Sequence, residues 1–303
     1  MSKPTRNRNL AQKAGKRRKK SQSPDHRNDT ASKRFTSAKN TQNARFMQGR
    51  RQKNRDSGAQ NWLWGHHAVK AALQNPRRTH HKLLLTPKMR DRLGVDVLAV
   101  PGCEIIEVHP GEIDSVLPEG AVHQGVALNT APLPGFALDE VARPAKGLLV
   151  VLDQITDPHN VGAMFRLAAA FGAKGVIMQS RHAPPMSGAV AKVAVGMIET
   201  VPHVLVTNIG NALLELQKRG WRVTGLAGET DLELEAALMQ AQAEVLVLGA
   251  EGPGLRKRVR DCCDQLAKIP MPGSGTYGAE SLNVATAAGI ALYEAARQLQ
   301  KQA

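Results

Sequence analysis

The sequence is poor in cysteine and has no long apolar run. Its three cysteines, Cys103 and the adjacent Cys262 and Cys263, form neither a CxxC spacing nor an even set for disulfide bonds, which indicates a reducing compartment. No apolar run approaches the roughly 20 residues of a membrane-spanning helix, and no secretory signal is recognisable. We therefore expect a soluble, cytoplasmic protein that does not contact a membrane.

Metal-ligand spacing is also missing. The histidines occur mainly as adjacent pairs, His66 with His67 and His80 with His81. Neighbouring residues on a helix or strand point in different directions, so these pairs do not offer the geometry of a metal site. We expect no bound metal.

Acidic residues are scarce in the first 60 residues. This segment holds 18 Lys and Arg against 3 Asp and Glu, whereas the remainder holds 23 of each, so the segment alone accounts for the net charge of +15. Because it also has hardly any aliphatic residues, it cannot bury enough surface to offset the entropy of ordering, and we expect a disordered tail. Basic runs at residues 16–20 and 50–53 favour binding to a polyanion such as RNA over a merely solubilising role.

A small α/β domain is predicted for residues 61–131. Apolar and turn patterns predict strands at residues 62–65, 82–86, 104–108 and 122–128, with helices at 66–74, 88–93 and 112–117, and this alternation is typical of α/β units. Prolines then mark residues 132–146 as a linker. A basic cluster in this domain either contacts phosphate or forms a solvated face; it comprises Arg77, Arg78, Lys82, Lys88, Arg90 and Arg92.

Residues 147–303 repeat the alternation with stronger signals. Apolar runs predict strands at 148–152, 175–178, 203–206, 222–226, 245–248 and 266–269, with helices near 161–171, 188–198, 209–218 and 232–240. Continuously apolar strands joined by helices favour a parallel sheet that is covered on both faces. Ligands of such sheets bind beyond the carboxyl ends of the strands, so the residues that follow each strand are the candidates for a site.

Polar residues follow three of these strand ends. Asn160 precedes an apolar helix and, taken alone, is explained by helix capping. Arg166 lies within that helix and must either extend to solvent or face an anion. Glu251 directly follows a buried strand between small residues, and Ser281 with Asn283 opens an Ala-rich helix, where capping is again an alternative.

The ordered set of motifs resembles the SpoU (TrmH-like) family of RNA ribose 2′-O-methyltransferases. The three motifs are Asp-Pro-His-Asn-Val-Gly-Ala at 157–163 with Arg166, Leu-Gly-Ala-Glu-Gly at 248–252, and Ile-Pro-Met at 269–271 followed by Ser-Leu-Asn-Val at 281–284. Residues 65–69 and 123–127 are similar to the ribosomal-protein-like substrate-binding domain of that family. Residues 192–202 are most similar to the large-subunit rRNA guanosine methyltransferases.

The resemblance implies a fold, a cofactor and a site. It implies a catalytic domain with a deep trefoil knot, S-adenosyl-L-methionine as cofactor, a homodimer with the site near the subunit interface, and 2′-O-methylation of a ribose in structured RNA, a guanosine of 23S rRNA in particular. Cofactor contacts are expected at Gly249, Ile269 and Leu282. The polar residues of the site are expected to be Asn160, Arg166, Glu251, Ser281 and Asn283.

Two alternatives stay open. The substrate is a ribose of tRNA in one, and the protein is a non-catalytic RNA-binding assembly factor in the other; the presence of all five polar residues disfavours the second. The loop from Pro272 to Glu280 is longer than the resemblance leads us to expect. It is not a phosphate-binding P-loop, because no Gly-Lys-Ser or Gly-Lys-Thr follows its glycines.

Overall fold

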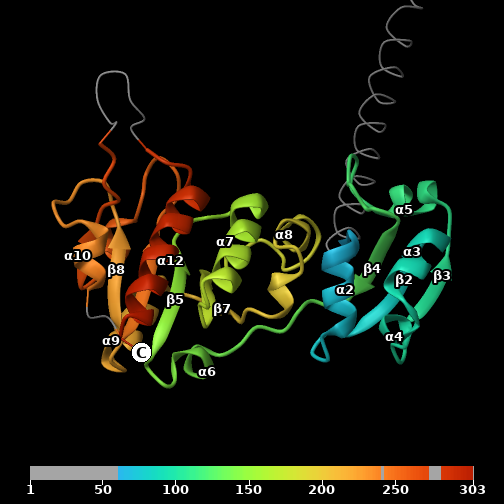
Figure 1. Cartoon of the computed structure of the whole chain (residues 1–303), viewed down its shortest axis with the longest axis horizontal. Helices are drawn as coiled ribbons and strands as arrows, with labels where there is room; N and C mark the ends of the chain where they lie inside the picture. The colour runs from blue at the N-terminus through green and yellow to red at the C-terminus, as the bar shows by residue number, and fades with distance from the viewer. Residues whose placement is uncertain (1–60, 240–241, 273–280, 303) are drawn as a thin grey trace, which may run out of the picture. The chain divides into compact units, whose positions relative to one another are not determined.

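The computed structural model describes residues 61–239, 242–272 and 281–302 (Figure 1). The tail expected at residues 1–60 and all but the first residue of the long loop Pro272–Glu280 lie outside these ranges. Within them, the strands form one sheet of four strands and a second sheet of six.

The first sheet is mixed and has the order β1-β4-β2-β3. Its strands are β1 (Trp62–Trp64), β2 (His80–Leu85), β3 (Glu104–Glu107) and β4 (Val126–Thr130). β4 runs antiparallel to both β1 and β2, while β3 runs parallel to β2. The accompanying helices are α2 (His66–Gln74), α3 (Pro87–Leu93), α4 (Val95–Leu98) and α5 (Pro110–Val116).

Both faces of this sheet are covered. Leu83 of β2 belongs to a core cluster with Val69 of α2, whereas the next residue, Leu84, belongs to a cluster with Ile113 of α5. This division follows from the alternation of side chains along a strand. The small α/β unit predicted from the sequence is therefore present.

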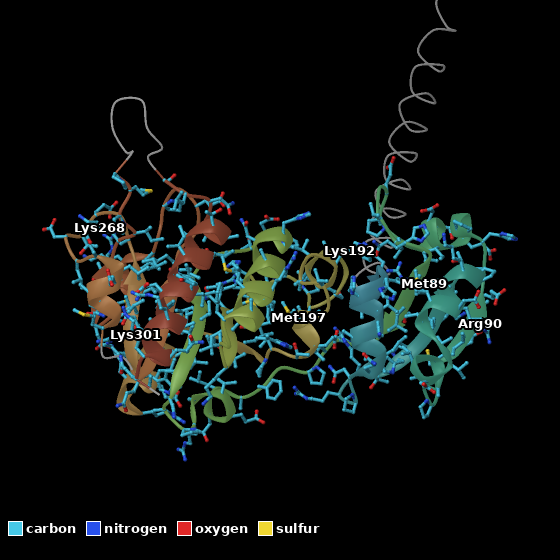
Figure 2. All side chains as sticks on the ribbon, in the orientation of Figure 1. Met89, Arg90, Lys192, Met197, Lys268 and Lys301 are labelled. Carbon is cyan, nitrogen blue, oxygen red and sulfur yellow. The ribbon has the colours of Figure 1, made fainter. Side chains whose placement is uncertain are left out.

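The basic cluster predicted for this region does not form one surface. Arg78 is only 4% exposed, and its guanidinium forms a 2.7 Å ion pair with Glu199. Arg90 lies on the outer side of α3 (Figure 2), where it pairs with Glu107 at 3.5 Å. Arg78 is thus a buried structural residue, and Arg90 belongs to a solvated face.

The second sheet is entirely parallel and has the order β10-β8-β9-β5-β6-β7. Its strands are β5 (Gly147–Leu152), β6 (Gly175–Gln179), β7 (His203–Val206), β8 (Arg222–Leu226), β9 (Ala243–Leu248) and β10 (Gln265–Ala267). The prediction of a parallel sheet is confirmed, and the strand bounds differ from the predicted ones by at most two residues. β5 lies between β9 and β6, where the order of the strands changes direction; open α/β sheets bind ligands at such a point.

Helices cover both faces of the parallel sheet. On one face, Val150 shares a core cluster with Phe165 of α7 (Pro158–Ala170) and Leu292 of α12 (Val284–Gln300), and these two helices lie side by side (Figure 1). The other face is covered by α9 (Ile209–Lys218), by α11 (Lys257–Arg260) and by α6 (Leu138–Ala142), which lies within the segment expected to be a linker. The remaining short elements are α8 (Gly188–Val193), η1 (Met197–Glu199) and α10 (Leu234–Leu238).

The helix predicted near 188–198 is wrong in its second half. α8 ends at Val193, and the next residues include Val195 with φ +54° and Gly196 with φ +86°. A Cβ at Gly196 would lie 2.6 Å from Cβ of Ala71, so the chain here approaches α2 closely enough to require glycine. That approach depends on tertiary packing, which helix periodicity does not encode.

Candidate active site at the carboxyl ends of the strands

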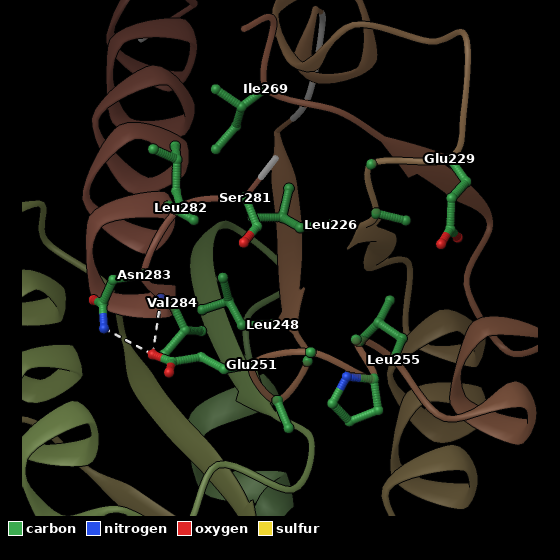
Figure 3. A pocket seen from close by; sticks show the side chains of 18 of the residues that line it. Leu226, Glu229, Leu248, Glu251, Leu255, Ile269, Ser281, Leu282, Asn283 and Val284 are labelled. Atoms are coloured by element: carbon green, nitrogen blue, oxygen red, sulfur yellow. Dashed lines mark hydrogen bonds between the residues drawn. The ribbon is translucent and has the colours of Figure 1, made fainter. Parts of the chain in front are cut away.

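A pocket of about 800 Å³ opens at the carboxyl ends of β8, β9 and β10 (Figure 3). Leu226, Leu248 and Ala267, the last residues of these strands, line it, and Val284 at the start of α12 contributes to its wall. All three residues expected to contact a cofactor also line it; they are Gly249, Ile269 and Leu282. Its volume lies within the range of small-molecule sites.

Three polar side chains from separate motifs meet at this pocket. Oε1 of Glu251 accepts a hydrogen bond from Nδ2 of Asn283 at 2.7 Å and from Nδ2 of Asn160 at 3.3 Å. The backbone N–H of Val284 also donates to it at 3.4 Å (Figure 3). The carboxylate of Glu251 therefore lies at the N-terminus of α12, where a backbone N–H that has no acceptor within the helix points at it.

Asn283 has two functions at once. Its Oδ1 caps α12 by accepting hydrogen bonds from the backbone N–H groups of Ala285 at 2.9 Å and Thr286 at 3.3 Å, while its Nδ2 donates to Glu251. The two explanations offered by the sequence for Asn283, capping and membership of a site cluster, therefore apply together. The cap fixes the side chain so that its amide N–H points at the carboxylate.

Asn160 is not the cap of α7. That position belongs to Asp157, whose carboxylate accepts hydrogen bonds from the backbone N–H groups of His159 at 3.2 Å and Asn160 at 3.3 Å. Capping as the explanation of Asn160 is thus wrong. Because Asp157 satisfies the first backbone donors of the helix, the side chain of Asn160 is available to donate to Glu251.

The other two predicted polar residues differ in position. Ser281 lines the pocket beside Leu282. Arg166 is exposed on α7 and does not line the pocket. Its spacing from Asn160 explains this, because six helical residues rotate a side chain about 120° away and carry it about 9 Å along the axis. The convergence expected for all five residues is therefore seen within one chain for Asn160, Glu251, Ser281 and Asn283, and not for Arg166.

Gly249 allows the chain to fold back tightly after β9. A Cβ at this position would lie 2.3 Å from the carbonyl carbon of Gly254 and 2.5 Å from the backbone nitrogen of Leu255. The turn is closed by a 3.0 Å hydrogen bond from the N–H of Gly254 to the carbonyl oxygen of Ala250. Since the clash would involve backbone atoms, any side chain at Gly249 must displace the pocket wall.

Two charged residues of the pocket were missed from the sequence. Glu229 follows β8, and its carboxylate pairs with Arg260 of α11 at 2.5 Å; both residues line the pocket. Figure 3 shows Glu229 across the pocket from Asn283. The rule that residues after strands form the site was enough to find Glu229, whereas nothing local in the sequence distinguishes Arg260 from the other basic residues around it.

The cysteines and the possible metal ligands among the described residues limit which reactions the site can perform. Burial raises the pKa of the Cys263 thiol to about 12, and burial also raises the pKa of Cys103, so neither is an activated nucleophile. Among the described residues, no three His, Cys, Asp or Glu side chains gather as metal ligands. In the same ranges, no helix combines the length and apolar character needed to cross a membrane.

Fold and site together define a methyltransferase of the SpoU type. The SpoU rRNA Methylase family profile matches residues 147–293, and the profile described as RNA 2′-O ribose methyltransferase substrate binding matches residues 62–135. The chain belongs to the SpoU rRNA methylase family.

Named relatives cover most of the chain. It is 40% identical over 241 residues to the 23S rRNA (guanosine-2′-O-)-methyltransferase RlmB of Ralstonia nicotianae. This match covers 78% of the present chain and 95% of the relative. The enzyme of the same name from Vibrio cholerae is 40% identical over 243 residues, covering 78% and 96%.

Solved structures show the same fold. The SpoU methyltransferase AviRb from Streptomyces viridochromogenes in complex with AdoMet superposes with a TM-score of 0.65 at 26% identity, covering 78% of this chain and 89% of that one. The AdoMet-bound rRNA methyltransferase from Sinorhizobium meliloti superposes with a TM-score of 0.68 at 25% identity, covering 82% and 91%.

Proposed function

We propose that this protein transfers a methyl group from S-adenosyl-L-methionine to the 2′-hydroxyl of a ribose in structured RNA, and that the target is a guanosine of 23S rRNA. The observation that carries the proposal is the hydrogen-bonded junction of Asn160, Glu251 and Asn283 at the pocket. Three motifs, far apart in sequence, supply these side chains to one place in a SpoU-family chain. The names of the relatives support the choice of RNA and of nucleotide.

The pocket fits the proposed cofactor. Its volume suits a nucleoside-sized molecule, and apolar side chains that could pack against a planar base line its wall; they are Leu226, Leu248, Leu255, Ile269 and Leu282. Gly249 lets the chain fold back on Gly254, so that residues 249–255 line the pocket. When bound, S-adenosyl-L-methionine supplies an electrophilic methyl group on a sulfonium centre.

The polar residues would then orient and activate the acceptor. A ribose hydroxyl is a weak nucleophile at neutral pH, so it must be aligned with the methyl group and lose its proton. We assign to Asn160 and Glu251 the ordering of the loops around the pocket, and to Ser281 with Asn283 the holding of the motif that closes over the cofactor. Arg166 would hold a neighbouring phosphate and stabilise developing alkoxide charge, with phosphate or water as proton acceptor, because a guanidinium keeps its proton.

The position of Arg166 supports a homodimer. Leu167, its neighbour on α7, lies against α12, since a Cβ at Gly289 would be 3.6 Å from the Leu167 side chain. The outer side of α12 carries Ile290 at 40% and Tyr293 at 57% exposure. Exposed apolar residues of this size are typical of interaction surfaces, and most dimers are two-fold symmetric. We propose that a second copy covers this face and that Arg166 completes the pocket of its partner.

Mixed dimers test this arrangement. If Arg166 acts on the pocket of the other chain, mixing an Arg166→Ala chain with a Glu251→Gln chain restores activity, because one pocket in each mixed dimer keeps both residues. If the pocket uses its own Arg166, every pocket in the mixture lacks one residue and activity stays low. Light scattering on the purified chain measures the dimer itself.

Three further features of the resemblance belong to the same proposal. The C-terminal part of the catalytic domain would be threaded into a deep trefoil knot. The basic residues of positions 1–60 would add affinity for rRNA by counterion release. The protein would work in the cytoplasm, where rRNA is made and modified.

Mapping of 2′-O-methyl groups tests the substrate. In cells that lack the protein, one mark on 23S rRNA should disappear, and the purified chain with labelled S-adenosyl-L-methionine should restore it. Loss of a tRNA mark with intact 23S rRNA would select the tRNA alternative. Absence of cofactor binding by the purified chain would select the non-catalytic assembly factor.

Arg166→Ala tests the catalytic role of the arginine. We expect turnover to fall by about 10³-fold or more, which is the scale for loss of a charge-stabilising group, with S-adenosyl-L-methionine affinity nearly unchanged. Arg143→Ala is a matched control, because Arg143 is 71% exposed in its side chain and pairs only with a neighbouring surface aspartate. Loss of cofactor binding together with turnover would show that Arg166 is structural.

A further inference from the structure

The loop from Gly249 to Arg256 forms one wall of the pocket. All seven of its residues from 249 to 255 line the cavity. The loop contains three glycines, and two of them, Gly252 with φ +83° and Gly254 with φ +65°, adopt a backbone conformation that other residues rarely reach. A glycine-rich segment has a large conformational entropy when free, so a wall made of it needs restraint at both ends.

β9 restrains the start of the loop, and an ion pair between the exposed Arg256 and the buried Asp153 restrains its end. The backbone N–H of Arg256 donates to Oδ2 of Asp153 at 3.0 Å, and Nε of Arg256 donates to Oδ1 at 2.8 Å. Nη2 of the same arginine lies 2.5 Å from Oδ1. Arg256 therefore contacts both oxygens of one carboxylate: its backbone N–H bonds Oδ2, while its Nε and Nη2 both lie against Oδ1.

Asp153 is placed to act on both sides of the site. Its carboxylate is 0% exposed, and its backbone N–H extends the pairing of β5 with β9 by donating to the carbonyl oxygen of Leu248 at 2.8 Å. Asp153 is the first residue of the segment that leads to Asn160, and its carboxylate holds the loop that carries Glu251. A shift at Asp153 would thus move the two partners of the 3.3 Å hydrogen bond between Asn160 and Glu251.

We propose that Asp153 and Arg256 are a positioning pair, which holds the glycine-rich wall of the pocket in the shape that binds cofactor and fixes Glu251 against Asn160 and Asn283. Neither residue lines the pocket, so both act through the loop. The inference rests on the proposed use of this pocket for S-adenosyl-L-methionine. A buried carboxylate is stable as a charge only when it is paired, so the pair is broken by a change at either residue.

A nearby arginine provides the control. Arg258 is two residues further along and exposed, and its guanidinium reaches only the side-chain oxygen of Asn211 at 3.4 Å. Arg258→Gln removes the same charge from the same stretch of chain without touching the loop. Differences between Arg256→Gln and Arg258→Gln therefore report the pairing with Asp153 and not the loss of positive charge.

Calorimetric titration of the full chain with S-adenosyl-L-methionine measures the effect. We expect Arg256→Gln and Asp153→Asn to weaken binding by about 10- to 100-fold, the change produced by loss of a charge-assisted hydrogen bond, and Arg258→Gln to bind as the unaltered chain does. Arg256→Lys keeps the charge and the backbone N–H but replaces the paired Nε and Nη2 contacts with one ammonium group, so its affinity should lie between those of Arg256→Gln and the unaltered chain. Binding by Arg256→Gln equal to that of Arg258→Gln would overturn the proposal.

Hydrogen exchange without cofactor separates this inference from the proposed function. In Arg256→Gln, amides of residues 249–256 should exchange about tenfold faster or more, while those of α9 keep their protection. A melting temperature that falls with unchanged loop exchange and unchanged affinity would make the pair merely stabilising. If the unaltered chain failed to bind S-adenosyl-L-methionine, the proposed function would fail, and faster loop exchange in Arg256→Gln would still establish the pair.

Discussion

The two ends of β9 carry carboxylates in opposite environments. Glu244, near the start of the strand, is fully buried and pairs with Arg222 of β8 at 2.9 Å; burial raises its pKa to about 7. Glu251, three residues past the end of the strand, is exposed and held by N–H groups of Asn160, Asn283 and Val284. At β9, the amino end of the strand encloses its carboxylate, whereas the carboxyl end presents one at a pocket.

The difference follows from how a parallel sheet meets its helices. At the carboxyl ends of strands the chain turns toward helix N-termini, whose free N–H groups and partial positive charge attract acceptors. At the amino ends the chain arrives from helix C-termini and offers no such donors. Changes at the carboxyl end should therefore alter binding and turnover, and changes at the amino end should alter stability.

Gly249→Ala should have the largest effect on cofactor binding among the changes at the two ends of β9. The added Cβ would lie 2.3 Å from a backbone carbon of Gly254, so the pocket wall must move. Overpacking of this kind costs about 1–3 kcal/mol, and here it falls on the binding surface, so we expect S-adenosyl-L-methionine affinity to drop by about 10²-fold in a calorimetric titration. Gly111→Ala is the control, since a Cβ there meets nothing within 4 Å. Normal affinity in Gly249→Ala would show that the wall is pliable.

Glu251→Gln and Glu244→Gln compare the two ends directly. Both substitutions replace a carboxyl group with an amide at nearly constant volume. We expect Glu251→Gln to lower kcat/KM by about 10²-fold, because it loosens the positioned loops, with a change in the free energy of unfolding within about 0.5 kcal/mol, as is usual for exposed sites. Glu244→Gln should leave kcat/KM unchanged. Methyl-transfer assays and denaturant titrations measure the two effects. A lower kcat/KM in Glu244→Gln together with an unchanged kcat/KM in Glu251→Gln would contradict the assigned difference between the two ends of β9.

Asn283→Asp and Asn283→Ala separate capping from the contact with Glu251. Aspartate caps helices as well as asparagine does, but it loses the N–H donor and places a second carboxylate where Nδ2 now lies 2.7 Å from Glu251. We expect kcat/KM to fall by about tenfold in both variants. Only Asn283→Ala should lose about 1 kcal/mol of stability through the missing cap. Equal stability of the two variants in thermal unfolding would contradict the assigned cap.

Much of the site could be predicted because it follows the sheet. Glu251 and Asn283 stand directly after an apolar strand and directly before an Ala-rich helix, so their meeting at one edge follows from the topology of parallel strands. Other features depend on contacts between distant residues. Asp153 and Arg256 are 103 positions apart, the end of α8 depends on the approach of Gly196 to Ala71, and the direction of Arg166 depends on which face of α7 packs into the core. Local patterns do not encode these contacts.

The buried titratable groups at the amino end of the sheet should make the free energy of unfolding depend on pH. The pKa of Glu244 is raised from 4.5 to about 7, chiefly by burial, so its favourable contribution is complete below pH 4.5 and is lost as the pH rises through 7. His203, which is 2% exposed, has its pKa lowered from 6.5 to about 4 by burial and then by Arg78 and Arg77. Its contribution is complete above pH 6.5 and is lost as the pH falls through 4. Each change is worth about 3 kcal/mol.

Between pH 4.5 and 6.5 the contributions of Glu244 and His203 to the free energy of unfolding change with pH in opposite directions. The unaltered chain should therefore show a smaller change of stability with pH than either single variant. Glu244→Gln should uncover a rise in stability from pH 4 to 6.5, and His203→Gln should uncover a fall from pH 4.5 to 7, both measured by denaturant titration at a series of pH values. If Glu244→Gln gave the same pH profile as the unaltered chain, Glu244 would be ionised throughout. The pairing of Glu244 with Arg222 would then outweigh its burial, and the two carboxylates at β9 would be distinguished by their exposure alone.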